Sequence, residues 1–451
     1  MSKQKIQLSD HFDYSRLLRF VLPCVGTMLF TSIYGIVDGL CVSNFVGKTA
    51  FAAVNLIMPV PMLVGSVGFM LGTGGSAIVG ITLGEGDREK ADRYFSLFVW
   101  TGLVAGLLLA VVGFFAVRPA ASLLGAKGEM LDYAVRYGRL LMACLPFFIL
   151  QNMFQSFFVT AENPHLGFAF TVAAGVTNMV LDVVLVGMLH GGVEGAAIAT
   201  FISQAVGGVL PVFYFLNKRS TSSIHLGRAQ WNGGVIRSAC INGSSELMTN
   251  LSMSLVNILY NYQLLRFAGE NGVAAYGVIM YAAFLFVAVF VGYAVGSAPI
   301  VSYHYGARNH AELNNLYSKS LRLIGVIAVV MTALSMLVIP YVARIFVGYD
   351  AELLALTSHA FRVYALNFFL MGFNVYGSSF FTALGDGVTS ALISFLRTLL
   401  FQLLALIFLP MVLGIEGVWL AVTAAEAGAL CVTVLMFITK DKVFHYRKAS
   451  C

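Results

Sequence analysis

Hydrophobic residues along this chain form long, nearly unbroken runs that are separated by short polar segments. Each run is long enough for the roughly 20-residue helix that crosses about 30 Å of hydrocarbon. The pattern predicts twelve membrane spans, at residues 17–42, 51–82, 94–117, 133–160, 167–189, 194–216, 238–265, 273–303, 318–343, 358–383, 388–412 and 416–439.

Composition supports the same class of protein. Hydrophobic residues make up 59% of the 451 residues and charged residues only 11%, whereas about 25% of a soluble domain is charged. We therefore expect an all-α polytopic membrane protein.

The basic residues predict the orientation of the spans. Of 27 Lys and Arg, seven fall in the loops on one side and two, Arg362 and Arg397, fall within or near spans, which leaves eighteen for the other side. Because cytoplasmic loops carry an excess of Lys and Arg, both termini are expected in the cytoplasm. The net charge of +6 follows from this topology, and no basic run interleaved with aromatic residues suggests nucleic-acid binding.

The two halves of the chain resemble each other at a constant shift of 222 residues. FVGKTAFAAVNLIM (45–58) matches FAGENGVAAYGVIM (267–280), since 267 − 45 = 222, and SFFVTA (156–161) matches SSFFTA (378–383) at the same shift. Six spans return the chain to its starting side, so the halves insert in the same orientation. We expect two six-helix bundles related by a pseudo-twofold axis along the membrane normal. The predicted parts are an N-terminal lobe (1–216), a cytoplasmic linker (217–237) and a C-terminal lobe (238–451).

Two acids in the first half have no counterpart in the second. Asp38 corresponds to Tyr260 and Asp182 to Leu404, and Asn178 lies one helical turn before Asp182. Residues four apart share a helix face, and a charge at the bilayer centre costs at least about 2.5–3.5 kcal/mol. We interpret Asp38, Asn178 and Asp182 as a functional group; hydrogen bonding of each acid to nearby backbone is the structural alternative.

The chemistry of these residues suits cation coupling. Burial and a second acid nearby both favour the protonated form of a carboxyl group, which allows proton exchange near neutral pH. Two carboxylates and an amide oxygen also make a site for a hard cation such as sodium. The sequence leaves the choice between proton and sodium at Asp38 and Asp182 open.

The second half has polar residues of its own within the predicted spans. Glu246, Arg397 and Glu426 each lie about nine residues from the end of a span, or roughly 14 Å at 1.5 Å per residue, which brings all three near the midplane. Arg397 could pair with either glutamate, and an unpaired glutamate would attract an organic cation. Together with Asn257 and Tyr260, they are the candidates for a substrate cleft.

Pro23 lies inside the first predicted span. Proline lacks a backbone donor and kinks a helix interior. We expect a bend there, which could either respond to Asp38 or serve static packing.

Several motifs resemble one known family. IYGIVDGLCVSNFVG, NMVLDVVLV followed by GVEGAAIAT, and APIVSYHYGARN occur in an order and spacing similar to the multidrug and toxic compound extrusion (MATE) transporters, in particular their DinF-like bacterial branch. The resemblance covers essentially the whole chain.

The resemblance implies a twelve-helix, two-lobed antiporter in the bacterial plasma membrane. Such a protein exports cationic or amphipathic molecules in exchange for protons or sodium and needs no cofactor or bound metal. By the same resemblance, Asp38, Asn178 and Asp182 would form the coupling network and Pro23 would be the bending proline. The predicted tenth span, YALNFFLMGFNVYGSSFF, contains no acid, which departs from the branch that places its coupling acids in the second lobe.

Other functions remain as alternatives. A lipid-linked precursor flippase of the same superfamily would favour several basic residues in the cleft, where only Arg397 is a candidate. A membrane enzyme would need a cluster of nucleophile, histidine or metal ligands, and a channel would not need acids confined to one half. We expect small-molecule substrates, membrane lipids as surroundings, and a monomer.

Overall fold

The computed structural model describes residues 5–46 and 48–447 of the chain, and within these ranges every regular element is a helix. The first half contains α1 (Tyr14–Phe45), α2 (Lys48–Ile57), α3 (Pro59–Gly84), α4 (Arg88–Leu123), α5 (Gly128–Ala143), α6 (Leu145–Thr160), α7 (Pro164–Leu181), the π-helix η1 (Asp182–Met188) and α8 (Gly192–Leu216). The second half contains α9 (Gly233–Asn242), α10 (Ser244–Gly306), α11 (His310–Val347), α12 (Ala351–Ala365), α13 (Phe368–Ala383), α14 (Gly387–Phe395), the π-helix η2 (Leu396–Leu400), α15 (Phe401–Leu413), α16 (Ile415–Thr439) and α17 (Asp441–Phe444).

These helices give the twelve predicted spans. Nine helices of the described residues are long and apolar enough to cross a membrane, and two helix pairs, bent by 54° and 46°, each make one more. The remaining span comes from α10, whose 63 residues would extend about 95 Å as one helix, far beyond a bilayer. Its backbone breaks at Gly269 (φ 60°, ψ −150°), a conformation that glycine adopts without steric cost, so α10 folds back as two spans.

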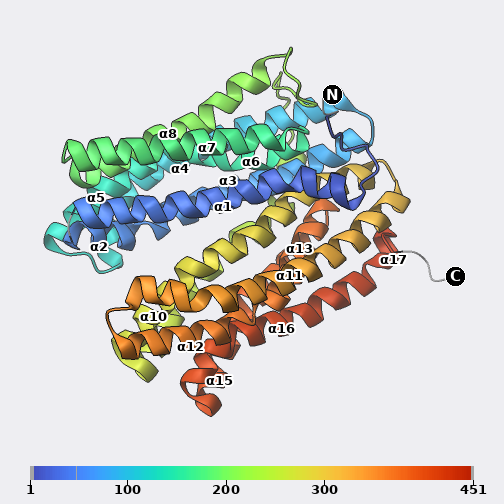
Figure 1. Ribbon diagram of the computed structural model, residues 1–451. Helices are drawn as coiled ribbons and strands as arrows, with labels where there is room; N and C mark the ends of the chain where they lie inside the picture. The colour runs from blue at the N-terminus through green and yellow to red at the C-terminus, as the bar shows by residue number, and fades with distance from the viewer. Residues whose placement is uncertain (1–4, 47, 448–451) are drawn as a thin grey trace.

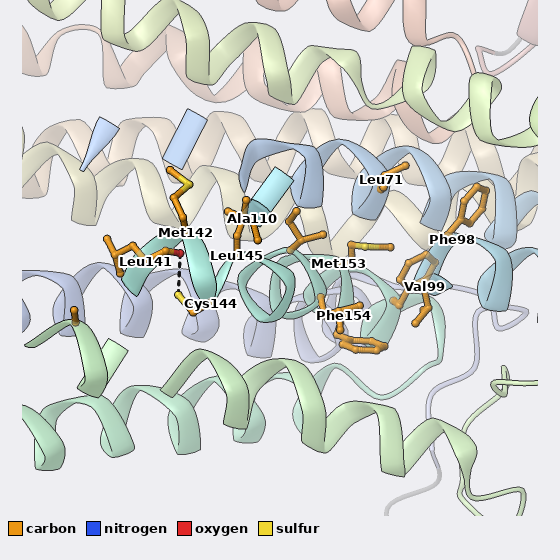
Figure 2. Packing of buried hydrophobic residues seen from close by; sticks show 14 of the residues in the cluster. Leu71, Phe98, Val99, Ala110, Leu141, Met142, Cys144, Leu145, Met153 and Phe154 are labelled. Carbon is orange, nitrogen blue, oxygen red and sulfur yellow. Dashed lines mark hydrogen bonds between the residues drawn. The ribbon is translucent and has the colours of Figure 1, made fainter. Parts of the chain in front are cut away.

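The helices form two bundles, one from each half of the chain (Figure 1). One apolar core lies almost wholly within the first half, and Figure 2 shows part of it, where side chains of α3, α4, α5 and α6 interlock. A second core lies within the second half. Between the two halves, residues 217–232 form a non-helical connection, and α9 begins at Gly233.

The two bundles meet closely at the end that carries both termini and diverge toward the other end (Figure 1). Glycines make this contact possible. A Cβ atom on Gly84 would overlap the carbonyl oxygen of Tyr303, and one on Gly306 would overlap that of Ile81. Small residues allow helix backbones to approach this closely. The interface between α3 and the second arm of α10 therefore closes one end of the molecule.

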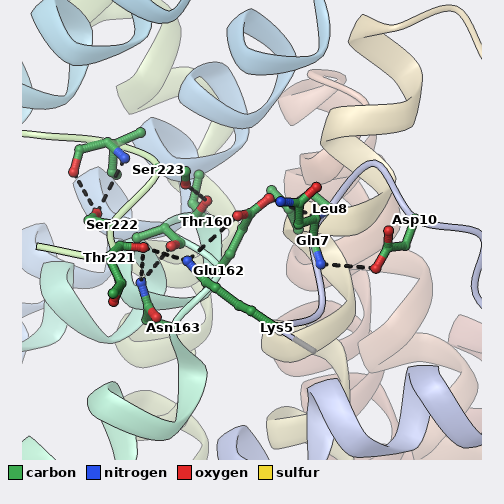
Figure 3. A network of polar contacts seen from close by, with 12 residues as sticks. Lys5, Gln7, Leu8, Asp10, Thr160, Glu162, Asn163, Thr221, Ser222 and Ser223 are labelled. Carbon is green, nitrogen blue, oxygen red and sulfur yellow. Dashed lines mark hydrogen bonds and ion pairs between the residues drawn. The ribbon is translucent and has the colours of Figure 1, made fainter. Parts of the chain in front are cut away.

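The segment before α1 reinforces the same end by binding to both bundles. The Leu8 N–H donates to Glu162 Oε1 at 2.8 Å in the first half, and the Phe12 N–H donates to Glu312 Oε1 at 2.9 Å in the second. Figure 3 shows the first of these networks, in which Lys5 also reaches Glu162. Leu8 and Phe12 are themselves buried, so the segment packs between the two bundles and binds to both.

Candidate functional site

Among the described residues, those predicted for function fall into two groups, one in the first bundle and one mainly in the second. The first contains the three residues predicted for cation coupling. Asp38 comes from α1, Asn178 from the last turn of α7, and Asp182 from the residue at which α7 passes into the π-helix η1. Short π-helical segments of this kind occur frequently at functional sites.

Asp182 is completely inaccessible and Asn178 is also buried. The carboxyl groups of Asp38 and Asp182 lie next to each other. Both oxygens of Asp182, Oδ1 of Asp38 and both amide atoms of Asn178 lack a hydrogen-bond partner among the described residues. Buried polar atoms are nearly always hydrogen-bonded, so this group has the composition of a site that receives a proton or a cation.

Tyr137 belongs to the same group, although no feature of the sequence marks it as a site residue. The residue is fully buried in α5, close to both carboxyl groups, and its hydroxyl has no partner in the described chain. Tyrosine is common near the ends of membrane spans, so its type and position carried no signal.

The second group lines a cavity of about 450 Å³ between the bundles. The C-terminal bundle contributes most of its wall, and α3 and α6 of the N-terminal bundle contribute the rest. All five residues predicted for the cleft line this cavity: Glu246, Asn257, Tyr260, Arg397 and Glu426. Asp38, Asn178 and Asp182 do not line it, so the two groups are spatially separate.

Arg397 pairs with Glu426 rather than with Glu246. Its Nε lies 2.8 Å from Glu426 Oε1, and the Asn374 amide donates to Oε2 at 2.7 Å. Thr433 in turn donates to Asn374 at 2.8 Å. Glu426 is wholly buried and the Arg397 side chain is 13% exposed. The pair is satisfied by hydrogen bonds on both carboxylate oxygens, which offsets the cost of burying it.

Glu246 carries the unpaired carboxylate of the cavity. It lies close enough to Arg397 to interact electrostatically, yet it makes no ion pair in the part of the chain that the structure describes. Tyr260 lies further along the same arm of α10, about 21 Å from Glu246 at 1.5 Å per residue. The rings of Tyr260 and Tyr276 stack with centroids 4.8 Å apart, and Tyr276 donates to Asn257 at 3.0 Å. The cavity therefore presents one free acid and, at another level, a pair of stacked aromatic rings.

The repeat shift shows that each bundle carries charges that the other lacks. The positions 222 residues before Glu246, Arg397 and Glu426 are occupied by Cys24, Gly175 and Gln204. Likewise, the positions in the second bundle that correspond to the acids of the first bundle hold apolar or aromatic residues. The two bundles therefore share a fold but carry different polar side chains.

Pro23 lies in the interior of α1, which continues as one helix across it. The Thr27 hydroxyl, one turn further along the helix, donates to the Pro23 carbonyl at 2.9 Å. The helix is therefore not broken at Pro23.

Comparison with known proteins identifies the family. A family model described as MatE matches residues 23–184 and 247–407, once in each half and over more than half of the chain. The chain belongs to the MatE family. Members of this family are the MATE transporters, so the protein is a membrane transporter and not an enzyme.

Individual relatives match along nearly the whole length. The multidrug export protein MepA of Staphylococcus saprophyticus is 22% identical over 434 residues, which cover 95% of each chain. A crystal structure of MATE in complex with MaL6 has a TM-score of 0.92 and 25% identity and covers 98% of this chain and 100% of its own. An outward-facing multidrug resistance MATE transporter of the MOP superfamily, at 24% identity and TM-score 0.92, covers 99% of both. The twelve-helix, two-bundle architecture predicted from the sequence is confirmed.

Proposed function

We propose that this MATE protein is a secondary-active exporter that exchanges cationic or amphipathic small molecules for protons or sodium ions. The observation that carries the proposal is the separation of two acidic sites among the membrane-spanning helices. One site, at Asp38 and Asp182, has polar atoms that lack partners among the described residues and does not line the cavity between the bundles. The other, at Glu246, faces a cavity that is large enough for an organic molecule. An antiporter needs both a small-ion site and a substrate site.

The coupling site in this proposal consists of Asp38, Asn178 and Asp182, with Tyr137 as an additional ligand or donor. Two adjacent buried carboxylates repel each other unless one is protonated or a cation lies between them. Binding and release of that proton or sodium ion changes the charge within the first bundle. Such a change provides the differential free energy that a ligand needs to shift a conformational equilibrium.

The substrate site lies in the cavity at Glu246. Arg397 and Glu426 neutralise each other, so the unpaired Glu246 gives the cavity a net negative charge. Ammonium groups are attracted both to this carboxylate and to tyrosine faces. A pyrophosphate-linked lipid would instead need several cations, and Arg397 is the one basic residue among the described residues that line the cavity, which disfavours the flippase alternative.

The orientation and assembly complete the proposal. MepA is a bacterial export protein by its name, and we place this chain in the bacterial plasma membrane as a monomer with both termini cytoplasmic. The lobes are 1–216 and 238–451, joined by 217–237. Because the bundles meet at the end with the termini, this orientation makes the described state outward-facing.

The test is transport by the purified protein in proteoliposomes. Efflux of an ethidium-like cation would be measured under a pH gradient and then under a sodium gradient, for the wild type, Asp182→Asn and the exposed control Asp132→Asn. We expect one gradient to drive flux that Asp182→Asn abolishes and Asp132→Asn retains. Flux that persists in Asp182→Asn would overturn the coupling assignment. Absence of flux under both gradients would overturn the antiporter proposal.

A further inference from the structure

Arg397 uses only part of its guanidinium group within the protein. Its Nε bonds to Glu426, while the two terminal nitrogens make no hydrogen bond to the described residues. An arginine side chain has five N–H donors in a planar fork, so four donors remain. The side chain lines the cavity and is only slightly exposed. Those donors therefore face the space that a substrate occupies.

Glu246 lies on the same cavity wall region and is also without an ion-pair partner among the described residues. The distance between Glu246 and Arg397 is too long for an ion pair, but their charges still interact. The cavity therefore presents a free acceptor of one charge and a free donor edge of the other. If Glu246 and Arg397 had only a structural role, we would expect them to form an ion pair with each other.

We propose that Arg397 forms a subsite for an acidic group, which works together with Glu246 so that the preferred substrates carry both an ammonium group and a carboxylate. This inference rests on the proposed export function and refines its substrate class. The carboxylate accepts hydrogen bonds from the terminal nitrogens of Arg397, and the ammonium group meets Glu246. The Arg397 fork then contacts Glu426 on one edge and the substrate on another.

The surroundings of Arg397 keep this edge available. Glu426 cannot move toward the cavity freely, because Asn374 binds both its side chain and its backbone carbonyl, at 2.7 and 2.9 Å. The fixed carboxylate holds the guanidinium plane in one orientation. A planar guanidinium recognises carboxylates in a bidentate manner that a lysine ammonium does not reproduce. The stacked rings of Tyr260 and Tyr276 line the same cavity and supply an apolar surface for an aromatic part of the substrate.

A matched pair of dyes tests the acidic subsite. Rhodamine 110 carries a carboxylate, and rhodamine 123 is its methyl ester, so the two differ only at the group assigned to Arg397. Transport and equilibrium binding of each dye would be measured for the wild type and for Arg397→Lys, which keeps a positive charge beside Glu426. Arg362→Lys, on an exposed position of α12, is the control for an arginine-to-lysine change outside the cavity.

We expect the acid-to-ester ratio of affinities to fall at least about tenfold in Arg397→Lys, as for the loss of a charge-assisted hydrogen bond, and to stay at the wild-type value in Arg362→Lys. The double variant Arg397→Gln with Glu426→Gln removes both charges together and should show the same fall if Arg397→Lys folds poorly. An unchanged ratio in both cavity variants would overturn the acidic subsite while leaving export intact. Failure of the wild type to transport either dye or an ethidium-like cation under any gradient would instead refute the proposed export function.

Discussion

Substitution of Gly84 by alanine should shift the molecule out of the described state, in which the bundles meet at the end that carries the termini. The added Cβ would overlap the carbonyl oxygen of Tyr303 on the facing helix. That oxygen belongs to backbone, which cannot rotate away as a side chain can, so α3 and α10 must separate. Overpacking of this kind costs about 1–3 kcal/mol, and the cost applies only to the state in which the two lobes meet at this end.

Such a cost changes conformational populations by about 5- to 150-fold. An alternative state that lies a few kcal/mol higher is populated at about 0.1–10%. The upper part of the range would therefore make the alternative state, in which the bundles separate at this end, the major one. Gly306→Ala should act in the same direction, since its Cβ would overlap the carbonyl oxygen of Ile81.

The assay is double electron–electron resonance in nanodiscs, with native cysteines replaced and spin labels at Lys127 and Tyr349. These exposed positions are related by the repeat shift and lie just before α5 and α12, in the loops at the end where the lobes diverge. We expect the Gly84→Ala variant to show a shorter main distance than the unsubstituted protein. Gly277→Ala is the matched control, because a Cβ at this helical glycine of α10 meets no atom within 4 Å. Identical distributions for Gly84→Ala and the unsubstituted protein would refute the reasoning, as would an equal shift in Gly277→Ala.

Three further predictions concern single polar contacts. Glu426→Ala leaves Arg397 as an uncompensated buried charge and should lower the free energy of unfolding by about 3–5 kcal/mol, whereas replacement of both residues by leucine should cost much less; thermal unfolding in detergent compares the two. Asp386 caps α14 and lies 2.7 Å from Lys440; burial opposes its ionisation, but hydrogen bonds outweigh burial and hold the pKa of Asp386 below its ordinary value of 3.8. Asp386→Ala should therefore lower stability by about 1 kcal/mol at neutral pH, and the difference from wild type should shrink as the pH falls below 3.8; a constant difference in acid would contradict this. Glu312→Gln weakens the hydrogen bonds that hold the segment before α1, so trypsin should cleave that segment faster than in wild type. An unchanged cleavage rate would contradict the role of Glu312 in anchoring the segment.

Much of this protein could be predicted from the sequence because the bilayer imposes local rules. A helix that crosses hydrocarbon must satisfy its own backbone hydrogen bonds and must be apolar over a known length. For this reason the twelve spans and the two-bundle repeat can be predicted from the sequence. The acids within spans can be recognised for the same reason, since each one interrupts a segment that is otherwise apolar. Asp182 and Glu246 stand out in the sequence without any knowledge of their neighbours.

The partners of those acids are decided only by tertiary structure. Arg397 lies 29 residues from Glu426 and at a similar depth to Glu246, so spacing and depth leave both pairings open. The packing of η2 against α16 selects Glu426, and the hydrogen bond from Asn374 then fixes it. Tyr137 joins Asp38 and Asp182 for the same reason, because its side chain on α5 comes close to the two carboxyl groups only once the bundle is assembled. Side-chain pairing depends on which helix faces meet, and this is a property of the packed bundle that no single span encodes.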